Sequence, residues 1–251
     1  MKTHKAKTFL RAGASLALAV LAVAVAGANL AQAQSCNVEW TGNAGTDVWG
    51  TAKNWSTDKV PGPTSNACIL TAPSTGSVDA TATPSISVNS IQLGQGDGLA
   101  FGSGTVTIAE SLTSQGYLTL FGTTTLKAAS VDMQSGTLVG GGTIASSLTN
   151  NGYLGPTNGE TVTVTGNYTQ TPSGQLNVTF STAYPPALVV NSNATLSGTL
   201  TVTVNLKHPP KPGSTYTAMT FGSLSGEFTS TTVEGGGTVQ YTNNSVVVTF
   251  Q

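Results

Sequence analysis

Apolar and polar residues alternate with a period of two along much of the chain after residue 84. In the clearest runs, at 161–165, 199–206 and 245–250, valine, leucine or phenylalanine alternates with polar or β-branched residues, most often threonine. This alternation places one row of side chains in a core and the other in solvent, which predicts β-strands. Turn signals separate the runs, at Gln115-Gly116, Ser135-Gly136, Asn151-Gly152, Ser173-Gly174 and Ser197-Gly198. We therefore expect an all-β fold.

The strand pattern contains an internal repeat. Residues 107–118 (TIAESLTSQGYL) and 143–154 (TIASSLTNNGYL) are identical at nine of twelve positions and are 36 residues apart. Related Gly-x-Leu segments recur with spacings of 20, 16, 22 and 24 residues, starting at Gly116, Gly136, Gly152, Gly174 and Gly198. A unit of about 18 to 20 residues is too short for a propeller blade. It fits one coil of a right-handed parallel β-helix, a solenoid in which each coil buries its apolar row against the next. The alternative is an antiparallel β-sandwich with chance similarity between hairpins.

The N-terminus has the pattern of an export signal. A basic head (Lys2, Lys5, Lys7 and Arg11) precedes an uncharged stretch from 12 to 38, and Ala31-Gln32-Ala33 supplies a small-x-small cleavage pattern. We predict a signal peptide over 1–33, an N-terminal cap and linker over 34–84, and a β-solenoid over 85–251. An uncleaved membrane anchor is the alternative for the first segment. A cleaved signal would place the mature chain outside the cell, at the cell surface or in the periplasm, without a transmembrane segment.

Charge is scarce in this chain. Only 9 basic and 10 acidic residues occur among 251, or 8%, against about 25% in ordinary soluble domains. Such a chain has too few basic residues for a nucleic-acid-binding face. Beyond residue 33 there are five lysines, no arginine and ten acids, a net charge of −5. Export also bears on Cys36 and Cys68, because an oxidising compartment favours a disulfide between them over two free thiols. We expect this disulfide to staple the cap.

Several short motifs resemble those of secreted bacterial β-helix proteins. Residues 187–230 contain Leu188-Val189-Val190, the run Ala194–Leu200, Pro212-Gly213 before Tyr216, and Gly226-x-Phe228. In these features the segment resembles the last coils of autotransporter passenger domains. Near the start, the chain is similar to the opening of many such proteins at Trp40-Thr41-Gly42, Trp49, Asn54-Trp55 and Pro61-Gly62. The resemblance implies an adhesin-like β-helix. Autotransporters also carry a C-terminal membrane barrel, for which the residues after 230 are too few, so we expect a passenger-like solenoid without one.

The search for catalytic chemistry is mostly negative. Glycoside hydrolysis typically needs two closely placed carboxylates, but no two acids lie closer than seven residues in this sequence. Glu110 and Asp132 are 22 residues apart, about one coil, and could lie on neighbouring rungs. His208 follows Lys207 in a proline-rich stretch without a nucleophile motif. We therefore predict no catalytic residue, no metal site and no cofactor.

Three tryptophans remain as candidate ligand-binding residues. Trp40, Trp49 and Trp55 all lie between the two cysteines. If exposed, they could stack on sugar rings. The alternative is a capping core that covers the open apolar end of the first coil, which a solenoid needs to avoid end-to-end aggregation. We favour the capping core for these residues.

Two functional hypotheses follow from the sequence. The first is a secreted or cell-surface, non-enzymatic β-solenoid that acts as an adhesin or as an envelope or matrix component. Its partners would be glycans or other surface proteins, contacted through uncharged polar strand faces. The second is a carbohydrate-active enzyme, a polysaccharide lyase or glycoside hydrolase, with an unrecognised site. A groove holding two carboxylates within about 10 Å would favour the enzyme.

Overall fold

The computed structural model describes residues 35–71, 76–83, 85–157, 159–180, 185–204 and 209–251. Within these ranges the regular structure is β-strand, apart from one short 3-10 helix, η1 (Ala52–Asn54). The all-β class that the sequence predicts is therefore confirmed. The predicted export signal, residues 1–33, lies outside the described residues, as does His208. No helix in the described ranges has both the length and the apolar character needed to cross a membrane.

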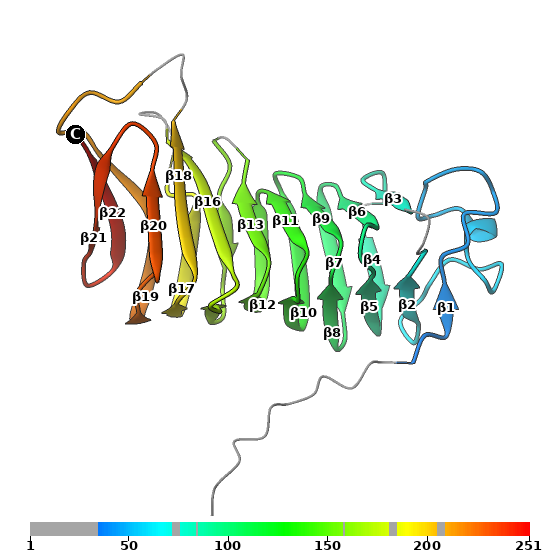
Figure 1. Cartoon of the computed structure of the whole chain (residues 1–251). Helices are drawn as coiled ribbons and strands as arrows, with labels where there is room; N and C mark the ends of the chain where they lie inside the picture. Colours follow the sequence, from blue (N-terminus) through cyan, green and yellow to red (C-terminus); the bar gives the residue numbers. More distant parts are fainter. Residues whose placement is uncertain (1–34, 72–75, 84, 158, 181–184, 205–208) are drawn as a thin grey trace, which may run out of the picture. The chain divides into compact units, whose positions relative to one another are not determined.

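The strands form two sheets that the chain visits in turn, and the pairing is parallel except at the C-terminal end of the larger sheet (Figure 1). The smaller sheet has eight strands, each paired with the strand of the next coil: β3 (Ser77–Ala80), β6 (Gly98–Phe101), β9 (Tyr117–Leu120), β11 (Thr137–Gly140), β13 (Tyr153–Pro156), β16 (Gln175–Phe180), β18 (Thr199–Val204) and β20 (Ser230–Val233). Strands adjacent in this sheet are never consecutive in sequence, because the chain crosses to the larger sheet between them. That connectivity defines a parallel β-solenoid.

The larger sheet has fourteen strands and supplies the rest of each coil. They are β1 (Val38–Glu39), β2 (Asn66–Ile69), β4 (Ser85–Val88), β5 (Ser90–Leu93), β7 (Gly104–Ile108), β8 (Ser111–Ser114), β10 (Thr124–Met133), β12 (Gly142–Asn150), β14 (Val162–Val164), β15 (Tyr168–Gln170), β17 (Leu188–Leu196), β19 (Thr215–Gly226), β21 (Gly237–Tyr241) and β22 (Ser245–Phe250). The long strand β10 pairs with β7 through its first half and with β8 through its second half, with a register shift between Lys127 and Ser130. Each coil therefore presents two strand segments here and one in the smaller sheet.

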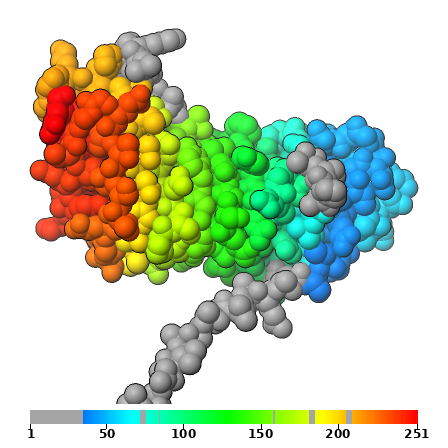
Figure 2. Space-filling model, viewed as in Figure 1, coloured from blue at the N-terminus to red at the C-terminus, as the bar shows by residue number. Residues whose placement is uncertain are grey.

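Pairing is parallel throughout the coils, so the antiparallel sandwich is wrong for this chain. Antiparallel ladders between named strands occur only at the C-terminal end, where β22 pairs with β19 and β21. Stacking also reaches into the segment 34–84, since β2 pairs with β5 and β3 with β6. Figure 2 shows the sequence order on the surface, where the colours pass steadily from blue to red across the coils.

A column of inward-facing leucines forms the centre of the core. Register places one leucine from each of six successive coils on top of the next: Leu99, Leu118, Leu138, Leu154, Leu176 and Leu200. All six are at most 2% exposed. The next position in this column is Thr231, which is exposed. The apolar column therefore stops at β20, and β22 covers the end of the core with its buried Val246, Val248 and Phe250.

The five predicted Gly-x-Leu turns all lie at one corner of the coil, directly before strands of the smaller sheet. A Cβ atom built on Gly136 would lie 2.3 Å from the carbonyl oxygen of Gly116 in the preceding coil. The same close approach to a backbone carbonyl, at 2.1 to 2.3 Å, occurs at the other four: Gly116, Gly152, Gly174 and Gly198. Only glycine fits at such distances. The Gly116 oxygen also accepts a hydrogen bond from the Thr137 amide at 2.9 Å, so this corner joins consecutive coils. We call it the glycine corner.

The N-terminal cap is held by a disulfide and a buried asparagine. Cys36 and Cys68 are bonded, which confirms the predicted pairing and links the chain ahead of β1 to β2. Asn54 is fully buried, accepts a hydrogen bond from the Ala44 amide at 3.0 Å, and donates to the Thr46 carbonyl at 2.7 Å. Its side chain thereby holds together a cap that has little regular structure.

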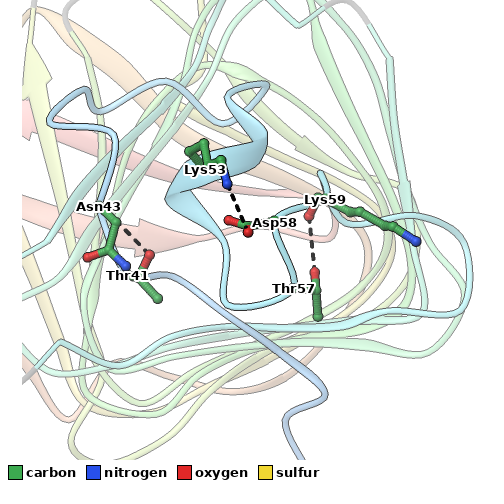
Figure 3. Close-up of polar contacts among 6 residues, drawn as sticks. All are labelled: Thr41, Asn43, Lys53, Thr57, Asp58 and Lys59. Carbon is green, nitrogen blue, oxygen red and sulfur yellow. Dashed lines mark hydrogen bonds and ion pairs between the residues drawn. The ribbon is translucent and has the colours of Figure 1, made fainter.

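The surface of the cap carries the ion pair of this region. Lys53 Nζ lies 2.9 Å from the Asp58 carboxylate, and both side chains are more than half exposed (Figure 3). The Thr57 hydroxyl donates to the Lys59 carbonyl nearby at 3.3 Å. An exposed ion pair of this kind contributes about 0 to 1 kcal/mol. Cap stability therefore depends chiefly on the disulfide and the buried groups.

Substitution of Gly136 by alanine tests the glycine corner. The added methyl group would overlap the Gly116 carbonyl, and this clash can be removed only if the backbones of the two coils move apart. We expect Gly136→Ala to lower the free energy of unfolding by about 1 to 3 kcal/mol, as for overpacked cores, measured by urea denaturation. Gly62→Ala is the matched control, because a Cβ there meets no atom within 4 Å. Equal stability of both variants would contradict the close-approach argument.

Reduction of the disulfide tests its part in the cap. The bonded cysteines are 32 positions apart, and a loop of that size is worth about 3 to 4 kcal/mol in the chain-entropy model. We expect the reduced protein to unfold at a clearly lower denaturant concentration than the oxidised protein. The Cys36→Ala/Cys68→Ala variant should not respond to the reductant. The disulfide would be shown to contribute nothing if the oxidised and reduced proteins had the same midpoint.

Candidate functional site

The three tryptophans form part of the core of the cap. Trp49 and Trp55 are 1% exposed and Trp40 is 8% exposed. The Trp55 ring packs edge-on against both others, with centroid distances of 5.0 Å to Trp40 and 4.8 Å to Trp49. Its Nε1 donates to the Trp49 carbonyl at 2.8 Å. Stacking on a sugar would need exposed ring faces, which these buried side chains do not present.

Glu110 and Asp132, the two acids whose spacing suggests neighbouring rungs, do not lie opposite each other. Glu110 accepts a backbone hydrogen bond from Ala129, whereas Asp132 lies three residues further along β10, where it pairs with Thr113. Three strand residues correspond to about 10 Å, so neighbouring coils do not bring these two positions opposite each other. Within the described residues, no cluster of three or more His, Cys, Asp or Glu side chains could hold a metal ion.

Asp97 is a buried carboxylate with a structural role. It is fully buried, and it accepts hydrogen bonds from the Gly76 amide at 2.7 Å, the Thr71 amide at 3.1 Å and the Thr71 hydroxyl. Three donors compensate for the loss of hydration that burial imposes on the carboxylate. This side chain thus fixes the turn at 94–98 to residues 71 and 76.

A shallow groove follows the glycine corner across three coils. Its volume is about 290 Å³ and its lining carries no charged side chain: Gln95, Gly96, Gln115, Gly116, Tyr117, Ser135, Gly136 and Thr137. The close stacking of the coils excludes side chains at Gly116 and Gly136, so these two lining positions present only backbone. Tyr117 stands at its edge and is 59% exposed. It is the most exposed large hydrophobic side chain in the described residues.

Tyr117 and Tyr153 occupy the same place in the 36-residue repeat but differ in environment. Both are first residues of smaller-sheet strands, two coils apart, with Thr137 between them. The Tyr153 ring lies over Gly155, where an added Cβ would be 2.5 Å from its Cε1 atom. Burial raises the pKa of the Tyr153 hydroxyl. The position equivalent to Gly155 is Thr119, and the Tyr117 ring remains largely exposed at the groove.

An amide column borders the groove on the side of the larger sheet. Gln115 Nε2 donates to Gln134 Oε1 at 3.0 Å. Gln134 in turn hydrogen-bonds the Asp132 carboxylate, and Asn151 Nδ2 donates to Asp132 Oδ1 at 3.2 Å. Side chains from three successive coils are therefore linked into one network that includes a single carboxylate.

Beyond this network the outer face of the larger sheet carries a column of hydroxyl and amide side chains. Successive coils place these residues in register: Gln92, Thr113, Asp132, Thr149, Thr169, Thr195 and Ser225. Adjacent members lie about 4.8 Å apart along the coil axis. We call these seven residues the polar column, and Asp132 is the one charged residue among them. Towards the N-terminus the same register continues through Cys68 to Glu39.

The groove and the polar column together offer three kinds of contact. The exposed tyrosine supplies a ring for stacking and a hydroxyl, the amides supply donors and acceptors, and the carboxylate is a strong acceptor. This is a combination that can bind a polyhydroxylated molecule. The residues that line the groove are glycine, glutamine, serine, threonine and tyrosine. Tyr117 is not among the residues predicted from the sequence, because nothing in the repeat distinguishes it from Tyr153.

The raised pKa of Asp132 should make the stability of the fold depend on pH. Burial raises its pKa above the ordinary value, despite hydrogen bonds from Gln134 and Asn151 that lower it. The folded state therefore holds this proton more tightly than the unfolded state, and stability is lost as pH rises from the unfolded pKa through the raised folded one. We expect Asp132→Asn to remove that loss, so its melting temperature relative to wild type should rise between pH 3 and pH 7.

Asp79→Asn is the matched control for this titration. Hydrogen bonds from the Thr81 hydroxyl and amide lower the pKa of Asp79, so its ionised form stabilises the folded state. The relative melting temperature of Asp79→Asn should therefore fall over the same pH range. A difference between Asp132→Asn and wild type that did not grow with pH would contradict the desolvation of Asp132.

Comparisons with known proteins do not add an assignment to this site. Searches against family models, curated proteins and solved structures each find no significant match for the chain. What the chain can bind is therefore inferred from the groove, the exposed Tyr117 and the polar column.

Proposed function

We propose that this chain is a secreted or cell-surface, non-enzymatic β-solenoid that contacts glycans, as an adhesin or as an envelope or matrix component. The observation that carries the proposal is the exposed Tyr117 beside an uncharged groove of amide and hydroxyl groups. Sugars combine apolar ring faces with many hydroxyls, so they need both an aromatic surface and neutral hydrogen-bonding groups. The absence of side chains at the corner glycines leaves room for an extended chain to lie across three coils.

Two features support a location outside the cytoplasm. The sequence of residues 1–33 has the charge and apolar pattern of a cleaved export signal. The Cys36–Cys68 disulfide suits an oxidising compartment. Together they favour a mature chain that meets its partners at the cell surface, in the periplasm or in the surrounding matrix.

The scattered acids favour binding over catalysis. A polysaccharide lyase or glycoside hydrolase remains the competing hypothesis, and hydrolysis would need an acid and a second carboxylate about 5 to 10 Å apart around the sugar. Asp132 is flanked in its column by Thr113 and Thr149, and it bonds to amides instead of a second carboxylate. A groove with one bordering carboxylate suits recognition better than hydrolysis.

Glycan-array binding of the purified chain from residue 34 tests the proposal. We expect binding to a subset of glycans, and Tyr117→Ala should weaken it roughly tenfold, as for a central aromatic contact. Phe121→Ala is the matched control, because Phe121 is 52% exposed but does not line the groove.

The outcomes separate the competing ideas. Wild-type chain that binds no glycan would remove the glycan-contact proposal and favour a purely structural role. Equal loss of binding in Tyr117→Ala and Phe121→Ala would place the contact outside the groove. Release of shortened oligosaccharides from a bound glycan would instead support the enzyme.

A further inference from the structure

We propose that Asp132 determines the specificity of this surface and selects neutral sugars over anionic ones. The inference rests on the proposed glycan contact and adds the class of sugar. It starts from an exception: between Gln92 and Ser225, every position of the polar column except Asp132 has a hydroxyl or amide side chain.

The position of Asp132 places its charge beside the groove. Gln134 lies two residues after Asp132, just past the end of β10, and it bonds to Gln115, which lines the groove. Ser135 and Gly136, the next two residues of the chain, also line the groove. A sugar that stacked on Tyr117 and extended around the corner would therefore reach the amides first and the Asp132 carboxylate next.

The amides around Asp132 are arranged as donors towards it. Asn151 Nδ2 donates to Asp132 at 3.2 Å from the next coil, and Gln134 bonds to Asp132 from two residues further along the chain. A carboxylate has about four lone-pair sites on its two oxygens, so two amide bonds leave room to accept sugar hydroxyls. The amides also fix the side chain, which lowers the entropy cost of binding.

Electrostatics then discriminate between sugars. The polar column has no cationic member, and the groove lining is uncharged, so nothing within this surface neutralises the Asp132 charge. Hydroxyl groups of a neutral sugar donate to the carboxylate. The carboxylate of a uronic acid or a sulfate ester accepts only, and it would face a like charge in a partly desolvated site. A neutral glycan should therefore bind better than an anionic one of the same length.

The test compares the binding of neutral and uronic-acid oligosaccharides of equal length, by calorimetry on the chain from residue 34. Wild type should prefer the neutral series. Asp132→Asn keeps the shape but removes the charge, so it should weaken neutral binding about tenfold or more, the loss expected for a hydrogen bond to a charged group. It should also shrink the ratio of neutral to anionic affinity. Glu39→Gln, which removes an exposed charge on β1 in the cap, should leave both affinities and their ratio unchanged.

The outcomes distinguish this inference from the proposed function. If wild type binds glycans but the affinity ratio is the same in Asp132→Asn, the specificity role is overturned and glycan contact stands. A wild-type preference for anionic sugars would overturn it as well. If wild type binds no glycan, both proposals fall. Melting temperatures of the variants show whether a loss of binding reflects unfolding, and a change in the ratio cannot arise from a uniform loss of folded protein.

Discussion

The close approach of consecutive backbones at the glycine corner is the constraint on which the rest of the structure depends. A single methyl group at Gly136 would lie 2.3 Å from the Gly116 carbonyl oxygen, so the coils can stack at hydrogen-bonding distance there only without side chains. Because the glycine corner is fixed, coils of different length still keep the same register in the strand before the corner and in the strand after it. The inward leucines then superimpose, and each outward residue lies directly over its counterpart in the next coil.

In-register stacking also accounts for the scarcity of charge. Like charges placed directly opposite on neighbouring strands destabilise a sheet, and a repeated sequence in a parallel solenoid would place identical charges about 4.8 Å apart. Threonine avoids this repulsion, keeps strand propensity and stays soluble. The 8% charged composition is thus a consequence of the architecture. It also leaves outer faces rich in neutral hydrogen-bonding groups, which is the property that the glycan proposal uses.

The sequence alone predicted the all-β class, the solenoid coil and the disulfide. Each depends on a local pattern: the class on the alternation of apolar and polar residues, the coil on the spacing of glycines, and the disulfide on the number of cysteines. It did not predict where the register would shift. The 36-residue repeat matches two coils at Leu112 and Leu148, yet Thr143 pairs through β10 with Thr105 and not with its repeat counterpart Thr107. The sequence also could not separate Tyr117 from Tyr153. The difference between them lies two residues further along each strand, where Tyr153 has Gly155 under its ring and Tyr117 has Thr119 at the equivalent position. Such differences arise from tertiary contacts that a repeat pattern does not encode.

Asp132 is informative because it departs from the rule that the rest of its column follows. A threonine would fit between Thr113 and Thr149 without the desolvation that raises the pKa of this carboxyl. Burying part of a charge costs stability, and the neighbouring amides offset only some of that cost. The proposed selectivity for neutral sugars rests on this combination: a partly desolvated carboxylate that lies beside the groove and accepts hydrogen bonds from amides of two coils.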